Sequence, residues 1–215
     1  MNAKSVEEIA FVLRGMRDAR DRIPGYRALV VDVVRELSLG MPVAPERIAE
    51  LAAKHGTPEK TIEKIGHSAE WSDGGIVGLN GLTLGDSRHR LHFEDVTMGT
   101  WCAWDSLFLV PIIGRAARLE STSPATNVAV EVSITPERVT GTEPATTVMS
   151  VVVPHPDTTA KTAAEVQAAF CHFVHFFEDR TTAESWVPAE RDAAVLSPED
   201  GFRLGQLVYG DLAAV

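Results

Sequence analysis

Apolar residues near the start of the chain recur every three or four positions, which is the spacing of one buried helical face. The pattern runs from Val6 to Met16 and again from Leu29 to Leu37, after which Gly40 suits the left-handed position that follows a helix. Pro45 fits the first turn of a third helix, and Thr57-Pro58 fits the start of a fourth. The pattern therefore predicts four helices.

A turn at Trp71 to Gly75 and a strand-like stretch from Ile76 to Leu84 follow these helices. Helices followed by a hairpin are typical of a winged helix, so residues 1–84 are predicted to form a winged-helix-like N-terminal domain. Many winged helices bind DNA through one helix in the major groove. Residues 1–84 hold 11 Lys+Arg against 12 Asp+Glu, and this balance argues against nucleic acid as a partner.

The pattern changes after the polar stretch Gly85 to Arg88, which is the predicted domain boundary. Residues 85–215 are predicted to form a mixed α/β catalytic domain with a β-sheet core, so the fold class is α+β. The predicted helices are 98–109 and 160–169, with two more whose N-caps are Thr181 and Ser197. The predicted strands are 89–93, 117–121, 128–134, 148–153 and 170–177.

Composition narrows the class of protein. The 45% hydrophobic and 23% charged fractions are those of a folded domain, and the net charge of −10 again disfavours nucleic acid. The longest apolar run, Leu107 to Ile113, contains Pro111 and is far shorter than the ~20 residues of a membrane span. The first residues lack the features of a secretory signal. We expect a cytoplasmic protein with no membrane partner.

The first candidate for chemistry is the segment TWCAWDSLF, in which Cys102 and Asp105 are three residues apart and share one face of the predicted helix. Trp101 and Trp104 add apolar bulk, and burial raises the pKa of both thiols and carboxyls. A neutral Asp105 could then store a proton. A buried cysteine often only fills space, but an unpaired buried carboxyl costs roughly 2 to 7 kcal/mol, which favours a functional role.

The second candidate is AAFCHFVHFF, where strand alternation predicts Cys171, Phe173 and His175 on one face. Zinc binding by Cys171 and His175 is disfavoured because structural sites take four ligands and catalytic sites three. The other histidines, such as His89, are isolated in the sequence. Phosphate-binding glycine loops and the nucleophile elbow are missing, so no cofactor is expected.

The chain resembles the alkylmercury lyase family over nearly its whole length. The resemblance lies in SLGMPVAPERIAEL, GGIVGLNGLTL, TWCAWDSLFLVPIIGRAARLES, the Glu143-Pro144 segment, FCHFVHFFEDRTTAESW and GFRLGQ. It implies a catalytic set of Cys102, Asp105 and Cys171, which also contact the mercury. Ser123 and His172 stand where many members carry additional cysteines.

This resemblance implies protonolytic cleavage of R–Hg⁺ to R–H and Hg²⁺, with the thiolates holding mercury and the aspartate moving the proton. It implies external thiols as cosubstrate and mercuric reductase as an acceptor of Hg²⁺, without any other cofactor. Trp101 and Phe173 are expected to line the substrate pocket, and a monomer is favoured. Two alternatives stay open: a winged-helix thiol-based mercury sensor, and a redox protein, although the Cys-x-x-Cys spacing is missing.

Overall fold

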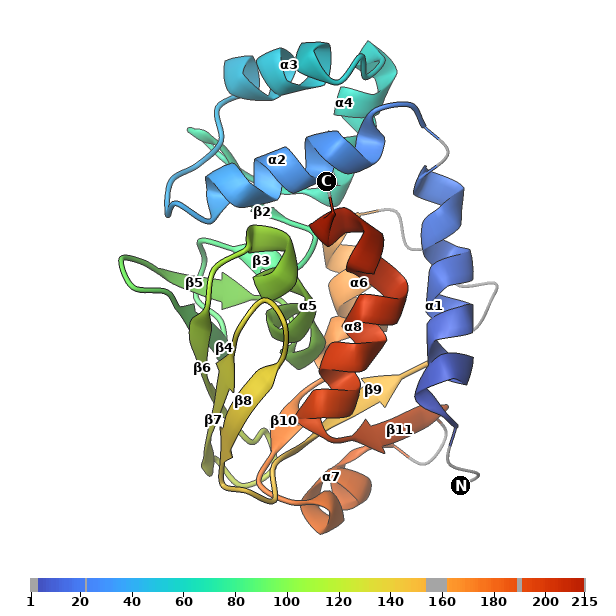
Figure 1. The fold of residues 1–215 in the computed structure, drawn as a ribbon, viewed down its shortest axis with the longest axis vertical. Coiled ribbons are helices and arrows are strands. Elements are labelled where there is room, and N and C mark those ends of the chain that lie inside the picture. Colours follow the sequence, from blue (N-terminus) through green and yellow to red (C-terminus); the bar gives the residue numbers. More distant parts are fainter. Residues whose placement is uncertain (1–3, 22, 154–161, 189–190, 215) are drawn as a thin grey trace.

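The computed structural model describes residues 4–21, 23–153, 162–188 and 191–214 (Figure 1). Its helical segments are α1 (Val6–Asp21), α2 (Tyr26–Leu37), α3 (Pro45–Lys54), α4 (Glu59–Ser68), α5 (Ala103–Ile113), α6 (Ala163–Ala169), the 3₁₀ turn η1 (Cys171–Phe173), α7 (Arg180–Trp186) and α8 (Pro198–Ala213). The four N-terminal helices predicted from periodicity are confirmed. The predicted start of the 160–169 helix, Ala160, lies outside the described residues.

Two antiparallel sheets complete the mixed α+β fold. The large sheet has the order β1-β2-β3-β5-β4-β6-β7-β8, and the small one the order β10-β9-β11. The strands of the large sheet are β1 (Glu70–Ser72), β2 (Gly75–Leu79), β3 (Leu82–Thr83), β4 (His89–His92), β5 (Thr97–Thr100), β6 (Ala117–Thr122), β7 (Ala129–Ile134) and β8 (Val139–Glu143). The small sheet contains β9 (Val148–Val152), β10 (Phe176–Phe177) and β11 (Ala193–Leu196).

The large sheet contains strands from both sides of the predicted boundary at Gly85. Its strands β1 to β3 precede that point, and β3 pairs directly with β5, which follows it. Helices α2, α3 and α4 lie together at one end of the molecule, whereas α1 packs along α8 (Figure 1). The division into two domains therefore stays a prediction, and the sheet physically connects the two parts.

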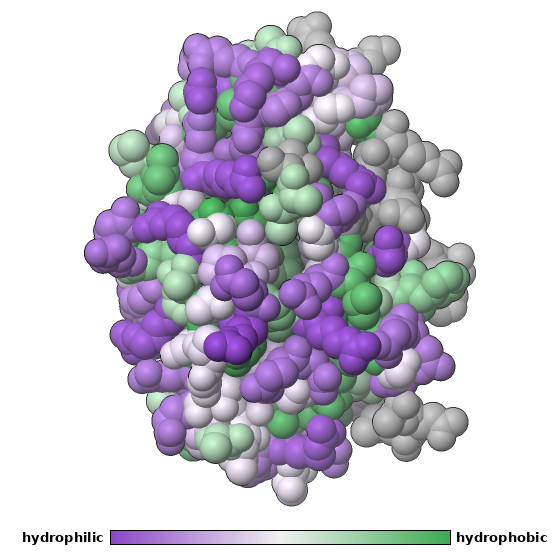
Figure 2. All heavy atoms as spheres, viewed as in Figure 1, coloured by the Kyte–Doolittle hydropathy of each residue, from purple (hydrophilic) through white to green (hydrophobic). Residues whose placement is uncertain are grey.

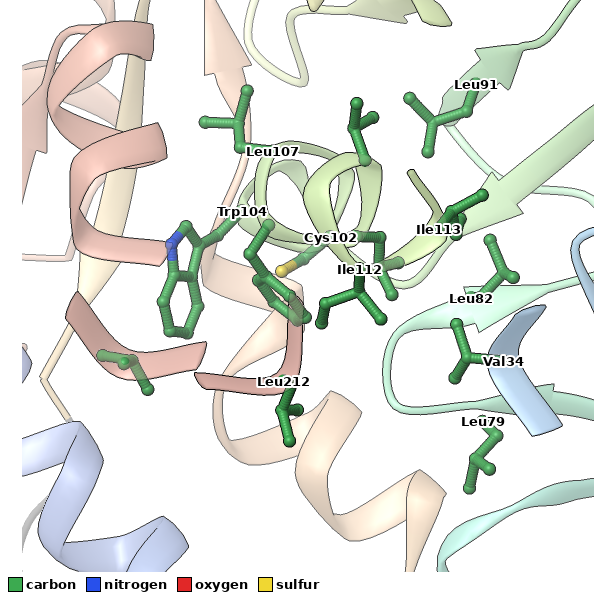
Figure 3. Packing of buried hydrophobic residues seen from close by; sticks show 14 of the residues in the cluster. Val34, Leu79, Leu82, Leu91, Cys102, Trp104, Leu107, Ile112, Ile113 and Leu212 are labelled. Carbon is green, nitrogen blue, oxygen red and sulfur yellow. The ribbon is translucent and has the colours of Figure 1, made fainter. Parts of the chain in front are cut away.

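Helix α5 is the centre of the core. Ten of its eleven side chains are buried, and only Pro111 is partly exposed. The helix is therefore apolar on nearly every side. Helix α8 approaches it closely: a Cβ on Gly205 would lie 2.6 Å from Cβ of Phe108. Figure 3 shows residues of α5 among the surrounding apolar side chains, with Cys102 inside the same cluster. The core thus encloses both cysteines, because Cys171 belongs to the same buried cluster.

Two predicted elements around the first cysteine are wrong. The stretch from Ile76 to Leu84 is two short strands, because Asn80 and Gly81 adopt positive φ angles and turn the chain between them. The predicted helix 98–109 begins only at Ala103, because Thr97–Thr100 pairs with β4 and β3 as strand β5. Sheet pairing overrides the local apolar pattern there.

Two predicted elements in the C-terminal part are also wrong. Residues 170–177 do not form one strand: Cys171–Phe173 is a 3₁₀ turn, and only Phe176 and Phe177 pair with β9. The N-cap of α7 is Asp179 rather than Thr181, since the Asp179 carboxylate accepts the Thr182 N–H at 2.8 Å. The predicted Ser197 cap of α8 is confirmed. Strands β8 and β11 were not predicted.

The face of the molecule in Figure 2 is mainly hydrophilic, with small hydrophobic areas between the polar side chains. In the described part of the chain, every helix is too short or too polar to cross a bilayer.

Candidate active site

Cys102 lies at the junction of strand β5 and helix α5, where it is the N-cap of the helix. Its backbone is extended, with φ −150° and ψ 173°, so Cys102 precedes the helix instead of sharing its face with Asp105 as predicted. A reciprocal capping box brings the two residues together. The Cys102 N–H donates to Asp105 Oδ2 at 2.9 Å, and the Cys102 side chain faces the Asp105 backbone N–H.

Asp105 is a carboxyl held in the core, with 7% of its surface exposed. Burial raises its pKa to about 7, although hydrogen bonds from the side chain and backbone of Cys102 lower it. The turn at Gly81 packs against this carboxyl, because a Cβ on Gly81 would lie 2.4 Å from Asp105 Cγ. Near neutral pH, Asp105 can therefore both hold and release a proton, in a fixed position.

Cys171 is the first residue of the turn η1. It is far from Cys102 and Asp105 in the sequence but lies beside them in the structure. The turn is tied to the start of α5, because the Ala103 N–H donates to the Val174 carbonyl at 3.0 Å. One ligand atom each from Cys102, Asp105 and Cys171 lies within 4.8 Å of the other two. This is the one such group of His, Cys, Asp or Glu ligands in the part of the chain that the structure describes.

Both thiols are buried, Cys102 with no exposed surface and Cys171 with 2%. Burial raises the pKa of Cys102 well above its ordinary value, and hydrogen bonding to Cys171 raises it further. The same hydrogen bond lowers the pKa of Cys171, but burial leaves it above its ordinary value. Both cysteines are therefore neutral thiols before any metal arrives, with Asp105 beside them to accept a proton.

The other residues singled out in the sequence lie around this cluster. Trp101, next to Cys102, is partly buried, as is Phe173 at the end of η1, whose ring lies 3.9 Å from the Arg191 guanidinium carbon. Ser123 is buried and His172 is exposed. His175 does not join Cys171 in a group of three ligands among the described residues.

Sequence reasoning missed one feature near the site, a buried contact between His89 and His175. The Nε2 atom of His89 lies 3.1 Å from Nδ1 of His175, and the two rings stack with centroids 5.3 Å apart. The residues are 86 positions apart in the sequence, so no local pattern connects them. Only the pairing of strands around β4 and the course of the chain after η1 bring them together.

Comparison with known proteins gives the geometry a family context. The family model described as alkylmercury lyase (MerB) matches residues 82–210. The alkylmercury lyase of Staphylococcus epidermidis is 33% identical, over 81% of this chain and 78% of that protein. The alkylmercury lyase of Pseudomonas putida is 30% identical, over 85% of this chain and 84% of that protein.

A solved structure, the crystal structure of the mercury-bound form of MerB2, has the same fold. The TM-score is 0.73 at 18% sequence identity, with 97% of this chain and 98% of that chain covered. The sequence matches and the common fold agree with the resemblance found in the motifs. The chain belongs to the alkylmercury lyase family.

Proposed function

We propose that this chain cleaves the carbon–mercury bond of organomercurials, R–Hg⁺, and that Cys102, Asp105 and Cys171 perform the reaction. The observation that carries the proposal is the buried cluster itself, two thiols and a carboxyl within 4.8 Å. Mercury(II) is a soft cation that prefers thiolate to nitrogen or oxygen, and two thiolates bind it without a tetrahedral cage. Mercury is here substrate and product, not a resident cofactor.

Capture of the substrate uses the two thiols in turn. One cysteine binds R–Hg⁺ as a thiolate, and its proton leaves with the ligand that it displaces from the mercury. Asp105, whose pKa is about 7, then accepts the proton of the other thiol. The second thiolate adds to the same mercury, and its electron density makes the bound carbon more basic.

The bond then breaks by proton transfer. Asp105 passes its proton to the carbon, the electron pair of the carbon–mercury bond forms the new C–H bond, and R–H leaves. Mercury stays as Hg²⁺ between the two thiolates, and Asp105 is again a carboxylate. Charge balances without any oxidant or reductant. The apolar surroundings of the cluster exclude water, so the carboxylic acid is the nearest proton donor.

The start and the end of the reaction involve other molecules. Trp101 and Phe173, which flank the two cysteines in the sequence and are partly buried, are proposed to contact the organic group. External thiols would exchange onto the bound Hg²⁺, return two protons to the cysteines and deliver the metal to a mercuric reductase. We propose no further cofactor and a monomeric, cytoplasmic enzyme.

The N-terminal part, residues 1–84, is proposed to be a winged-helix-like unit that covers the catalytic part instead of reading DNA. The main support is its balanced charge. Family membership favours the lyase over a mercury-sensing transcription regulator, and over a redox protein that would cycle a disulfide. A reversible disulfide would in any case leave the proton-holding carboxyl of Asp105 without a role.

Incubation with phenylmercury and headspace measurement of benzene tests the proposal directly. The wild type should release benzene in the presence of an external thiol, whereas Cys102→Ser and Cys171→Ser should each release almost none. A single thiolate cannot add the second ligand that makes the carbon basic. Circular dichroism of both variants must match the wild type. Wild-type turnover in either serine variant would refute the two-thiolate reaction.

A further inference from the structure

The contact between His89 and His175 joins two titratable side chains that the proposed reaction leaves unused. His89 lies on strand β4 with 1% of its surface exposed, and His175 is half-buried between η1 and β10. Four groups form a continuous chain of hydrogen bonds. Ser121 Oγ lies 2.9 Å from His89 Nδ1, His89 Nε2 lies 3.1 Å from His175 Nδ1, and His175 Nε2 lies 3.1 Å from the His172 carbonyl oxygen.

The last contact determines the direction of the whole chain. A carbonyl oxygen can only accept, so His175 Nε2 must carry the proton. Nδ1 of a neutral His175 is then an acceptor, and His89 Nε2 must donate to it. Nδ1 of a neutral His89 is likewise an acceptor, so the Ser121 hydroxyl donates. Every hydrogen bond therefore runs from β6 towards the turn that begins at Cys171.

Both rings are neutral at physiological pH. Burial lowers the pKa of His89 well below its ordinary value, and the nearby His175 and Arg88 lower it further. Burial likewise lowers the pKa of His175 to about 4, although its hydrogen bond to the His172 carbonyl raises it. Neutral rings are what the one-way chain requires, because a doubly protonated ring would place two N–H groups face to face.

The chain of bonds ends on the turn that carries Cys171. The other carbonyls of this turn have donors of their own. Ala103 N–H donates to Val174, and Ser150 Oγ donates to Phe173 at 2.8 Å. Ser150 Oγ also accepts the backbone N–H of His175 at 3.1 Å, so His175 is itself held against strand β9. The His172 carbonyl depends on the imidazole of His175.

We propose that His89 and His175 are positioning residues, which act through the His172 carbonyl to hold the Cys171 thiol against Cys102 and Asp105. The inference rests on the proposed function in one respect, the role of Cys171 as one of the two mercury ligands. Strand β4 is part of the large sheet, so these hydrogen bonds attach the turn η1 to a rigid element. The turn is one turn long and has few backbone hydrogen bonds of its own. A displacement near 1 Å at a reacting group can cost about 100-fold in rate.

The tautomers can be tested on the wild type, without any substitution. Nitrogen-15 NMR of the imidazole rings near neutral pH should show both His89 and His175 as neutral rings protonated on Nε2. A ring protonated on Nδ1, or a charged ring, at either position would contradict the proposed direction of these hydrogen bonds. This measurement does not depend on mercury chemistry, so it can fail or succeed independently of the proposed function.

Kinetics test the positioning role. His175→Phe keeps an aromatic ring against Trp186, with which His175 now makes an edge contact at 5.1 Å, but it removes the donor to the His172 carbonyl. We expect kcat for benzene release from phenylmercury to fall about 10- to 100-fold with KM little changed, because both cysteines remain to bind the mercury. His89→Gln, whose amide can still donate to His175, should keep more activity than His89→Phe.

Val132→Ala is the matched control for lost stability. Val132 is fully buried on β7 and lies outside the chain of hydrogen bonds, so its truncation should lower the melting temperature while folded protein keeps the wild-type kcat. Equal kcat in His175→Phe and the wild type, or equal loss in Val132→Ala and His175→Phe, would overturn the positioning role. Failure of the proposed function would look different, since the wild type itself would then release no benzene.

Discussion

The contact between Gly81 and Asp105 gives a sharp test of how the carboxyl is held. Gly81 has φ +95°, a conformation that residues with a Cβ rarely adopt. A Cβ at this position would lie 2.4 Å from Asp105 Cγ, 2.6 Å from Oδ1 and 2.8 Å from Cβ. All three distances are far inside van der Waals contact. We therefore expect Gly81→Ala to displace the Asp105 side chain.

The magnitude follows from two costs. The left-handed backbone costs a residue with a Cβ about 1 to 2 kcal/mol, and overpacking a filled site costs about 1 to 3 kcal/mol. The sum is smaller than the roughly 5 to 15 kcal/mol that stabilises a typical domain, so the variant should still fold. The carboxyl cannot retreat without losing its 2.9 Å hydrogen bond from the Cys102 N–H. Benzene release should then fall about 100-fold, the effect of a shift near 1 Å.

The assay compares Gly81→Ala with Gly114→Ala. Gly114 ends the same helix with φ +78°, and a Cβ there would meet nothing within 4 Å. Gly114→Ala thus carries a backbone cost of the same kind without touching Asp105, and it should keep wild-type benzene release. Both alanine variants should still bind one equivalent of phenylmercury, since both cysteines remain. Full activity in Gly81→Ala, or equal losses in the two variants, would refute the reasoning.

Two further predictions concern pH and partners. Burial raises the pKa of Asp105 from 3.8 to about 7, so between these values the folded state holds a proton that the unfolded state has lost, and stability falls as pH rises. From about pH 5 to about pH 7.5 the free energy of unfolding should fall by about 2 to 3 kcal/mol because of Asp105. Urea unfolding of Asp105→Asn should not show this contribution. The lowered pKa values of His89 and His175 act in the opposite direction, so the difference between the two proteins is the test, and parallel pH profiles would contradict it. In a mobility-shift assay the chain should show no salt-sensitive nanomolar binding to promoter DNA, and such binding would revive the sensor hypothesis.

The helices of the N-terminal part were predictable because each carries its own apolar repeat. The helix around Asp105 was only partly predictable. Its apolar residues indicated a buried helix, but the sequence from Thr97 to Thr100 gave no sign that it pairs with two strands and delays the helix to Ala103. Strand pairing between distant segments determines where such a helix begins, and the local pattern of apolar residues contains no information about that pairing.

The segment around Cys171 was mispredicted for a related reason. Its aromatic and β-branched residues are typical of a strand. In the structure, however, Ala103 and Ser150 donate hydrogen bonds to its carbonyls, and the segment forms a turn. The prediction that the two cysteines and Asp105 act together did not depend on this element, because it came from the family motifs. The role of His89 could not be predicted, since its partner is 86 residues away.

Asp105→Ala loaded with one equivalent of phenylmercury provides the most direct test of the central claim, that the thiols hold mercury and Asp105 delivers the proton. The measurement is the amount of benzene released over the time in which the wild type completes one turnover, with intact-protein mass spectrometry of the same sample. We predict almost no benzene and a protein mass increased by one phenylmercury group, because both cysteines remain and the proton donor is gone. Benzene release at a near-wild-type rate would mean that water or a thiol protonates the carbon, and it would contradict the account.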